Sequence, residues 1–312
     1  MTEDLAAALA EVLSADSVTE VVRLSGGASR DTFRFHADGR SLILQRQRSG
    51  DARDMGIEAR VVRAAGAAGV PVAKVVAAST DPSALGSAFM VLTAVEGETI
   101  ARKILRDDRY THARAVLPGQ LGEALAKLHV ADVGELSALP DGDQVRQYRE
   151  VLDQLNQPHP TFELVFKWLE ANRPPSRPPA LVHGDFRLGN VIVGDDGLRA
   201  VLDWELAHLG DPMEDLGWLC VKAWRFGSPL PVAGVARYEQ LFEAYEAAGG
   251  DAVDPEVVRW WEVLGTLKWG IMCIMQANAH IAGFTRSHEL AAIGRRVCEN
   301  EHDLFLALEG RW

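Results

Sequence analysis

The chain has few cysteines, no run of basic residues and no long apolar run, and each shortage excludes a class of protein. Its 312 residues contain three cysteines without a Cys-x-x-Cys spacing, so we expect buried free thiols rather than a zinc site or a disulfide framework. The net charge of −12 argues against a nucleic-acid-binding surface. No segment is apolar for long enough to cross a bilayer, and the acidic N-terminus does not resemble a signal peptide. These features predict a cytoplasmic protein.

The first third of the chain is rich in strand signals. Strands are predicted over 18–24, 32–36, 41–47, 72–78 and 87–95. A helix is predicted over 55–68, because its apolar residues recur at helical spacing. Between the first two strands lies a glycine-rich loop over 25–29, whose backbone amides are able to approach a phosphate. A hairpin without any ligand fits that loop equally well, and no Walker A sequence occurs in the chain.

After Gly97 the pattern becomes helical, apart from one central stretch. Helices are predicted over 100–116, 119–129, 143–156, 161–172, 232–248, 255–277 and 287–308, with one more beginning at Asp211. A stiff, proline-rich connector over 173–179 leads into the central stretch. The layout is therefore α+β, with an N-terminal lobe over 1–95 and a larger C-terminal lobe over 96–312.

The central stretch carries the polar residues that indicate chemistry. It reads Leu-Val-His-Gly-Asp-Phe-Arg-Leu-Gly-Asn over 181–190, and a second apolar run ends in Asp203. Two strands joined by a tight turn would bring Asp185, Asn190 and Asp203 together. Magnesium prefers oxygen ligands and usually takes one or two carboxylates from a protein, which suits Asn190 and Asp203. Asp185 is then left to accept the proton of a substrate hydroxyl, so the pattern predicts phosphoryl transfer.

Charged residues around this stretch have two readings each. Arg187 is placed to contact the transferred phosphoryl group, and a salt bridge on the loop surface is the alternative. His183 is expected to orient the loop by hydrogen bonding rather than to bind a metal. Asp211 is expected to cap the next helix or to hold the catalytic loop.

The motif His183-Gly-Asp185-x-x-x-x-Asn190, with Asp203 in Leu-Asp-Trp-Glu, resembles the aminoglycoside phosphotransferase (choline kinase-like) family. The resemblance covers nearly the whole chain. It implies a protein kinase-like bilobal fold with a small antiparallel sheet lobe, a larger mainly helical lobe, and ATP and Mg²⁺ as cofactors. The run from 204 to 218 is similar to the branch found as a kinase domain fused to some acyl-CoA dehydrogenases. A protein kinase is not expected, because no Asp-Phe-Gly or Ala-Pro-Glu segment follows.

The resemblance also implies a nucleotide site. Its implied residues are Ser25, Gly26, Gly27, Ala28, Ser29, Arg46, Glu58, Leu92, Thr93 and Val95. In this family a cation on the third strand contacts the phosphates and pairs with the helix glutamate, here Glu58. Gln45 stands where that cation is often found, and Arg46 follows it. Since neighbouring side chains of a strand face opposite ways, one of the two enters the site, and we favour Arg46.

The acceptor is expected between the central stretch and the C-terminal helices. Candidate contacts are Glu205, His208, Asp215, Trp218, Trp261, Lys268, Trp269 and Gln276, although core packing is the alternative for each tryptophan. A small-molecule hydroxyl compound is the expected partner, without nucleic acid or membrane, and a homodimer is compatible with the sequence. These C-terminal residues lack the dense acidity that an aminoglycoside would require, so a hydroxy acid or hydroxyacyl thioester is the alternative acceptor.

Two other functions stay open at the level of sequence. A catalytically silent nucleotide-binding protein would explain Gln45 but not the intact Asp185, Asn190 and Asp203. A metal-dependent hydrolase would need more ligands, because His208 is the nearest histidine besides His183.

Overall fold

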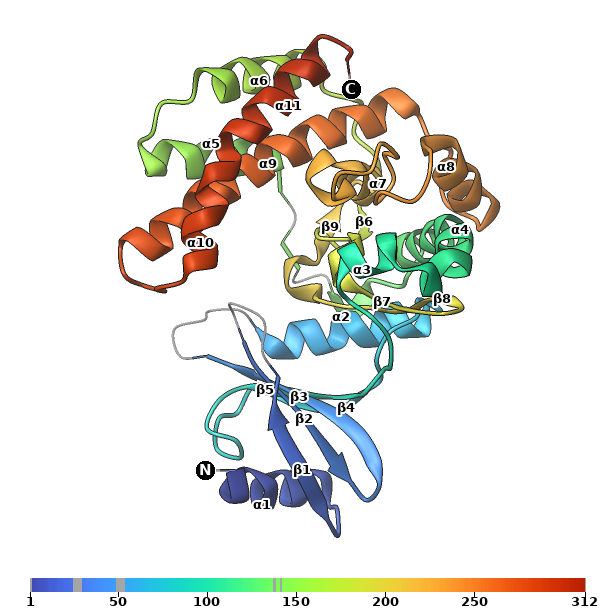
Figure 1. The fold of residues 1–312 in the computed structure, drawn as a ribbon, viewed down its shortest axis with the longest axis vertical. Helices are drawn as coiled ribbons and strands as arrows, with labels where there is room; N and C mark the ends of the chain where they lie inside the picture. The colour runs from blue at the N-terminus through green and yellow to red at the C-terminus, as the bar shows by residue number, and fades with distance from the viewer. Residues whose placement is uncertain (1, 25–29, 49–53, 137–138, 141, 312) are drawn as a thin grey trace.

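The computed structural model shows two lobes and describes residues 2–24, 30–48, 54–136, 139–140 and 142–311 (Figure 1). The expected loop 25–29 therefore lies outside the described residues. The N-terminal lobe is one antiparallel sheet in the order β1-β2-β3-β5-β4. Its strands are β1 (Val18–Arg23), β2 (Arg30–Ala37), β3 (Arg40–Gln47), β4 (Val75–Ser79) and β5 (Phe89–Thr93).

A helix covers each face of this sheet. Helix α1 (Thr2–Leu13) packs Leu9 against Leu42 and Leu44 of β3. Helix α2 (Met55–Ala67) lies on the opposite face, where Met55 packs near Ile43. The period-2 alternation of β3 thus separates the side chains that meet α1 from those that meet α2.

Helix α2 also contacts the C-terminal lobe. Its N-terminus is capped by Asp54, whose carboxylate accepts hydrogen bonds from the amides of Gly56 at 2.7 Å and Ile57 at 3.2 Å. Val61 and Val62 belong to the apolar core of the C-terminal lobe rather than to the sheet core. The helix therefore fills the space between the lobes, as Figure 1 shows.

The C-terminal lobe is mainly helical, as predicted. Its helices are α3 (Ala101–Arg106), α4 (Thr111–His129), α5 (Gln144–Leu155), α6 (Pro160–Ala171), α7 (Met213–Cys220), α8 (Tyr238–Ala247), α9 (Pro255–Ile281), α10 (His288–Ile293) and α11 (Val297–Leu308). Its strands are β6 (Ala180–Val182), β7 (Val191–Gly194), β8 (Gly197–Val201) and β9 (His208–Gly210). Among the described helices, none combines the length and the apolar character that a membrane span needs.

Several predicted boundaries were wrong. The break expected between two helices near Pro118 falls instead at Asp107, whose side chain accepts a hydrogen bond from the amide of Arg109 at 3.0 Å. Pro118 lies buried inside α4. The final helix is interrupted at Gly294, and β9 is a strand where only helices were expected, because it pairs with the distant β6.

Candidate active site

The hairpin of β7 and β8 brings the central polar residues together. Asn190 immediately precedes β7, and Asp203 follows β8 by two residues, with Val191 paired to Val201. The amide of Leu202 donates to the carbonyl of Asn190 at 2.8 Å, which extends the pairing to the site itself. Asp185 lies in the loop between β6 and this hairpin.

Three N–H donors hold the carboxylate of Asp185. Oδ1 accepts hydrogen bonds from Nε1 of Trp218 at 2.8 Å and Nε of Arg187 at 3.0 Å. Oδ2 accepts one from Nδ2 of Asn190 at 2.6 Å. An ionised carboxylate oxygen offers about two lone pairs, so Oδ1 is filled while Oδ2 keeps one position for a further donor. Arg187 also lies 4.8 Å over the ring of Trp224.

The loop before Asp185 is fixed by the fully buried Asp215. Its carboxylate accepts hydrogen bonds from the amides of His183 at 2.8 Å and Gly184 at 2.9 Å, and it lies 3.3 Å from Nε2 of His129. Burial raises the pKa of Asp215, but His129 and the backbone amides outweigh it and lower the pKa overall. The prediction that Asp215 contacts the acceptor was wrong, because the residue has no exposed surface.

Gly184 is needed at this turn. Its φ is +77°, and a Cβ there would lie 2.5 Å from the carbonyl oxygen of Leu206. Its own carbonyl accepts a hydrogen bond from Nζ of the buried Lys268 at 3.3 Å. The peptide before Asp185 is thus held by Asp215 on one side and Lys268 on the other.

Asp203 is half-buried and makes no hydrogen bond or ion pair with any residue that the structure describes. Burial raises its pKa to about 6, aided by the negative charge of Glu205 and opposed by Arg30. Its φ of +63° is uncommon for a residue other than glycine. A carboxylate without hydrogen-bond partners suits a bound cation, so the pair of Asn190 and Asp203 fits Mg²⁺.

Glu58 has a different partner from the one expected. Arg30 on β2 binds it through two hydrogen bonds, of 2.6 Å and 2.5 Å, and both residues are buried. Nη1 of Arg30 also donates to Oε1 of Gln45 at 3.1 Å, and Nη2 lies 3.4 Å from Glu205 of the C-terminal lobe. Gln45 therefore faces the site.

The expectation that Arg46 pairs with Glu58 was wrong. Arg46 shares its face of β3 with Leu42 and Leu44, which pack toward α1. It donates to the carbonyl of Leu85 at 3.3 Å and lies over the ring of Phe33. The apolar pattern of β3 decides this orientation, because it commits the even-numbered positions to the core under α1.

The expected adenine contacts lie at the end of β5. Leu92 is buried on the α2 face. The amide of Thr93 donates to the carbonyl of Lys74 at 2.9 Å and is engaged within the sheet. The amide of Val95 has no hydrogen bond among the described residues, which leaves it available to a ligand.

A cavity of about 450 Å³ lies between α5, the segment 205–208 and Lys268 of α9. Its described lining includes Glu205, His208 and Lys268, three of the predicted acceptor residues, together with Gln144 and Tyr148 of α5. Burial lowers the pKa of His208, but the adjacent carboxylate of Glu214 outweighs it, so the pKa is raised overall. The described lining thus carries the cations of Lys268 and Arg146 together with the carboxylates of Glu205, Asp143 and Glu150.

Two predicted acceptor residues lie in the core instead. Trp218 is 2% exposed and reaches the site only through its hydrogen bond to Asp185. Trp269 is 8% exposed, and its ring centroid is 4.9 Å from that of Trp224. Tryptophans of α7 and α9 pack there because these helices form the centre of the lobe.

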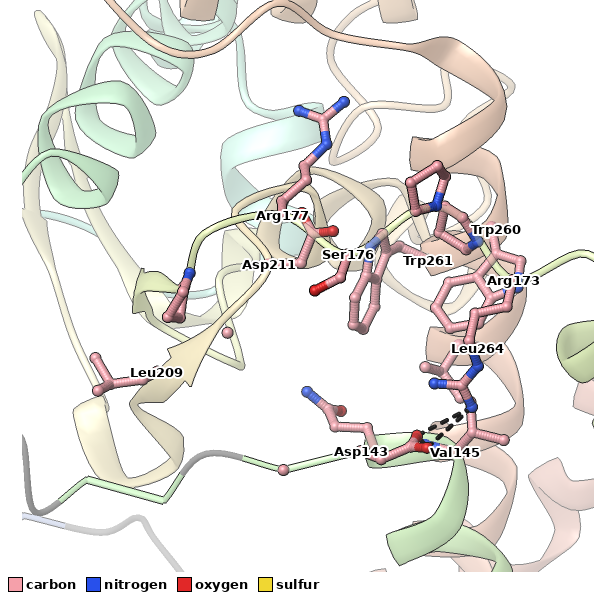
Figure 2. Close-up of a pocket in the computed structure, with 16 residues that line it drawn as sticks. Asp143, Val145, Arg173, Ser176, Arg177, Leu209, Asp211, Trp260, Trp261 and Leu264 are labelled. Atoms are coloured by element: carbon pink, nitrogen blue, oxygen red, sulfur yellow. Dashed lines mark hydrogen bonds and ion pairs between the residues drawn. The ribbon is translucent and has the colours of Figure 1, made fainter.

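A second cavity, of about 390 Å³, lies under the proline-rich connector (Figure 2). Figure 2 shows Ser176 and Arg177 of the connector above it, the ring of Trp261 behind it, and the ion pair of Arg173 with Asp143 at its edge. The described lining does not include Asp185, Asn190 or Asp203. The described lining of the first cavity does not include them either, but it contains Glu205, two residues after Asp203, and Lys268, which donates to the carbonyl of Gly184 beside Asp185. We therefore associate the first cavity with the site.

The sequence model described as the phosphotransferase enzyme family matches residues 20–261. The chain belongs to this family. Among curated relatives, the mouse protein acyl-CoA dehydrogenase family member 10 is 28% identical over 254 residues, which are 72% of this chain but 23% of that protein. The chain thus spans about a quarter of the length of that relative.

Solved structures agree with the fold of the phosphotransferase family. A Ralstonia eutropha protein proposed to be an aminoglycoside phosphotransferase superposes with a TM-score of 0.78 at 20% identity, covering 99% of this chain and 98% of its own. The aminoglycoside phosphotransferase APH(4)-Ia, solved with AMP-PNP and hygromycin B, gives 0.64 at 18% identity, covering 94% and 98%. At these identities the likeness shows the fold, and it confirms the predicted bilobal architecture.

No local sequence pattern indicated the roles of three residues at or near the candidate site. Arg30 looked like an ordinary strand residue, and Trp218 looked like packing or an acceptor contact. Tyr148 lines the first cavity from α5, a helix for which the sequence predicted no role in the site. For Asp215, the signal in the sequence was its place in the segment that resembles the family, after Gly-Asp-Pro.

Proposed function

We propose that this protein transfers the γ-phosphoryl group of ATP, bound with Mg²⁺, to a hydroxyl group of a small molecule, with Asp185 as the base. The observation that carries the proposal is the arrangement around Asp185. Three N–H donors fix its carboxylate, one position on Oδ2 stays free, and the unpaired Asp203 lies across the same hairpin. Positioning and charge neutralisation are what phosphoryl transfer requires from a protein.

Asp203 and Asn190 would hold the magnesium ion. Nδ2 of Asn190 donates to Asp185, so the amide oxygen remains as an acceptor for a cation. The described residues contain no cluster of three His, Cys, Asp or Glu side chains suited to a metal. That is consistent with an ion that takes most of its oxygens from phosphates and water. When bound, the ion would neutralise charge on the transferring group.

Each protein group then has one task. Oδ2 of Asp185 accepts the hydrogen bond of the acceptor hydroxyl and takes its proton as the oxygen attacks phosphorus. Arg187, held by Asp185 and Trp224, faces the transferred phosphoryl group. His183 keeps the loop in place, since its Nδ1 accepts from the amide of Asp185 at 3.2 Å and its Nε2 donates to the carbonyl of Leu202 at 2.9 Å.

The first cavity receives the acceptor in this proposal. Lys268 and Arg146 supply positive charge there, while Glu205, Asp143 and Glu150 supply negative charge. This mixture favours a hydroxy acid or hydroxyacyl thioester over a polycationic aminoglycoside, which would need a densely acidic wall. Hygromycin B, which is bound in the solved structure of APH(4)-Ia, is nevertheless an informative comparison compound.

The test is acceptor-dependent ADP release across a panel of hydroxy acids, their thioesters, amino alcohols and aminoglycosides. We expect Asp185→Ala and Asp203→Ala each to lower the rate by at least about 10³-fold, equivalent to about 4 kcal/mol of activation free energy. Circular dichroism and melting temperature check that both variants fold. Near-wild-type turnover by either variant would refute the assignment, and a wild-type protein that binds MgATP without turning over any acceptor would indicate a silent binding protein.

A further inference from the structure

We propose that Arg30 on β2 is the cation that binds the nucleotide phosphates in this chain, in place of a cation on β3. The inference rests on the proposed function, since it concerns the same nucleotide. It starts from a side chain that no sequence pattern singled out and that the structure buries at 5% exposure between the two lobes.

The position of Arg30 in the sheet makes the exchange geometrically sound. Gln45 pairs with Thr32 across β2 and β3, and it lies on the α2 face with its oxygen 3.1 Å from Nη1 of Arg30. A β3 cation at position 45 would therefore reach the place that Arg30 occupies. Arg30 also begins β2, so it follows directly after the glycine-rich segment of the sequence.

The contacts of Arg30 match those of a phosphate-binding cation. Glu58 holds the guanidinium of Arg30 through two parallel hydrogen bonds, which fix the orientation of the guanidinium plane. Such bidentate pairs are among the strongest hydrogen-bonded contacts between side chains. Its 3.4 Å contact with Glu205 is long by comparison and reaches the lobe that carries Asp203. Exchanging that contact for a phosphate oxygen would cost little and would leave the Glu58 pair intact.

Charge gives an independent reason. Asp203, Glu205, Glu58 and Asp185 surround this end of the cleft, and their mutual repulsion acts on Asp203. A polyphosphate approaching four carboxylates requires compensating positive charge besides the metal ion. Arg30 acts on Asp203 through its charge. Burial lowers the pKa of Arg30, but the bound Glu58 and the other carboxylates outweigh it and raise the pKa overall, so Arg30 stays charged.

The experiment measures the dissociation constant of AMP-PNP with Mg²⁺ by calorimetry, which needs no acceptor and no turnover. We expect Arg30→Met to weaken binding at least about tenfold. A lone buried Glu58 is also expected to destabilise this variant, so the deciding comparison uses Arg30→Gln with Glu58→Gln against Glu58→Gln alone. Removing both charges leaves no unpaired carboxylate, and we expect the double variant to bind at least about tenfold more weakly than the single one.

A variant in which the cation is moved from β2 to β3 completes the experiment. Adding Gln45→Lys to Arg30→Met should restore binding to within about threefold of the wild type, because Lys at 45 faces Glu58 from β3. The inference would be overturned if Glu58→Gln bound the nucleotide equally well with and without Arg30→Gln. It would also be overturned if Arg46→Met lost as much nucleotide affinity as Arg30→Met. A wild type that binds no nucleotide would instead refute the proposed function, so the two failures are distinguishable.

Discussion

His183 shows how one buried imidazole ties the catalytic loop to the hairpin. Its two ring nitrogens are both used, one accepting from the amide of Asp185 and one donating to the carbonyl of Leu202. This pattern requires a neutral imidazole that carries its proton on Nε2. Burial lowers the pKa of His183 by more than the charges of Asp215 and Asp185 raise it.

The lowered pKa of His183 predicts a loss of stability in mild acid. The unfolded chain protonates this histidine at about pH 6.5 and the folded protein only at lower pH. Stability from His183 is therefore full above about pH 6.5 and falls as the pH drops below it. The check is the melting temperature from pH 5 to 8 for the wild type and His183→Asn, and the slope between pH 5 and 6.5 should be shallower in the variant. Parallel curves would contradict the prediction.

Trp218 is a positioning residue for the proposed base. It donates to Asp185 at 2.8 Å, and the loss of a hydrogen bond to a charged group costs about 1.5–3 kcal/mol. Trp218→Phe keeps the ring and removes the donor, so we expect kcat to fall about tenfold or more while KM for MgATP changes less than about twofold. A simple packing defect would instead lower stability without this split.

Trp224 supplies the matched control. Its ring centroid is 5.3 Å from that of Trp218, and its Nε1 has no hydrogen-bond partner among the described residues. Trp224→Phe therefore removes the same N–H group from the same cluster without removing a contact to Asp185. We expect its kcat to stay within about threefold of the wild type. Equal losses in the two variants would assign the effect to aromatic packing.

At the scale of elements, helix α2 and the segment after β5 both help to join the lobes. Helix α2 packs one side against the sheet and the other against the C-terminal core. The segment after β5 pairs with β7, where the amide of Glu98 donates to the carbonyl of Val193 at 2.9 Å and receives the reverse bond at 3.0 Å. The connection between the lobes is thus hydrogen-bonded directly to the hairpin that carries the proposed metal ligands.

Gly97 makes that hinge contact sterically feasible. A Cβ at this position would lie 2.5 Å from Cγ2 of Ile192 and 2.8 Å from the carbonyl oxygen of Val193. We expect Gly97→Ala to destabilise the protein by about 1–3 kcal/mol, because backbone must shift to relieve the overlap. Urea titration measures the change. Gly119→Ala is the control, since its Cβ would meet nothing within 4 Å in α4, and it should stabilise by about 0.5–1 kcal/mol.

At the scale of the whole molecule, the proposed nucleotide site should couple ligand binding to stability. A ligand that binds the folded protein at 100 times its dissociation constant adds about 2.7 kcal/mol. We expect ADP with Mg²⁺ to raise the melting temperature by several degrees and EDTA to abolish most of the rise. Asp203→Asn should lose the part that depends on Mg²⁺. A rise unaffected by EDTA would argue against a metal-assisted nucleotide site.

The bilobal architecture and the meeting of Asp185, Asn190 and Asp203 followed from the sequence. The architecture followed from the order of the predicted strands and helices and from the family resemblance. The meeting of the three residues depends on short-range spacing, because the hairpin 191–201 places Asn190 and Asp203 at adjacent strand ends. The functions of these residues and the domain boundary at 95/96 stay predictions, as does a homodimer. Helix boundaries were predicted less accurately. Asp107 starts a new turn by accepting a hydrogen bond from the amide of Arg109, and β9 forms a strand because it pairs with the distant β6.

Tertiary structure alone decided which residues serve the central ones. The partner of Glu58 is 28 residues away on β2, and the sheet face that buries Leu42 and Leu44 turns Arg46 away from the cleft. Likewise α7 packs behind the loop, so Asp215 and Trp218 reach it from 31 to 33 residues further along the chain. Sequence spacing determines geometry within a turn or hairpin, but the side chains that complete a site depend on how distant elements pack together.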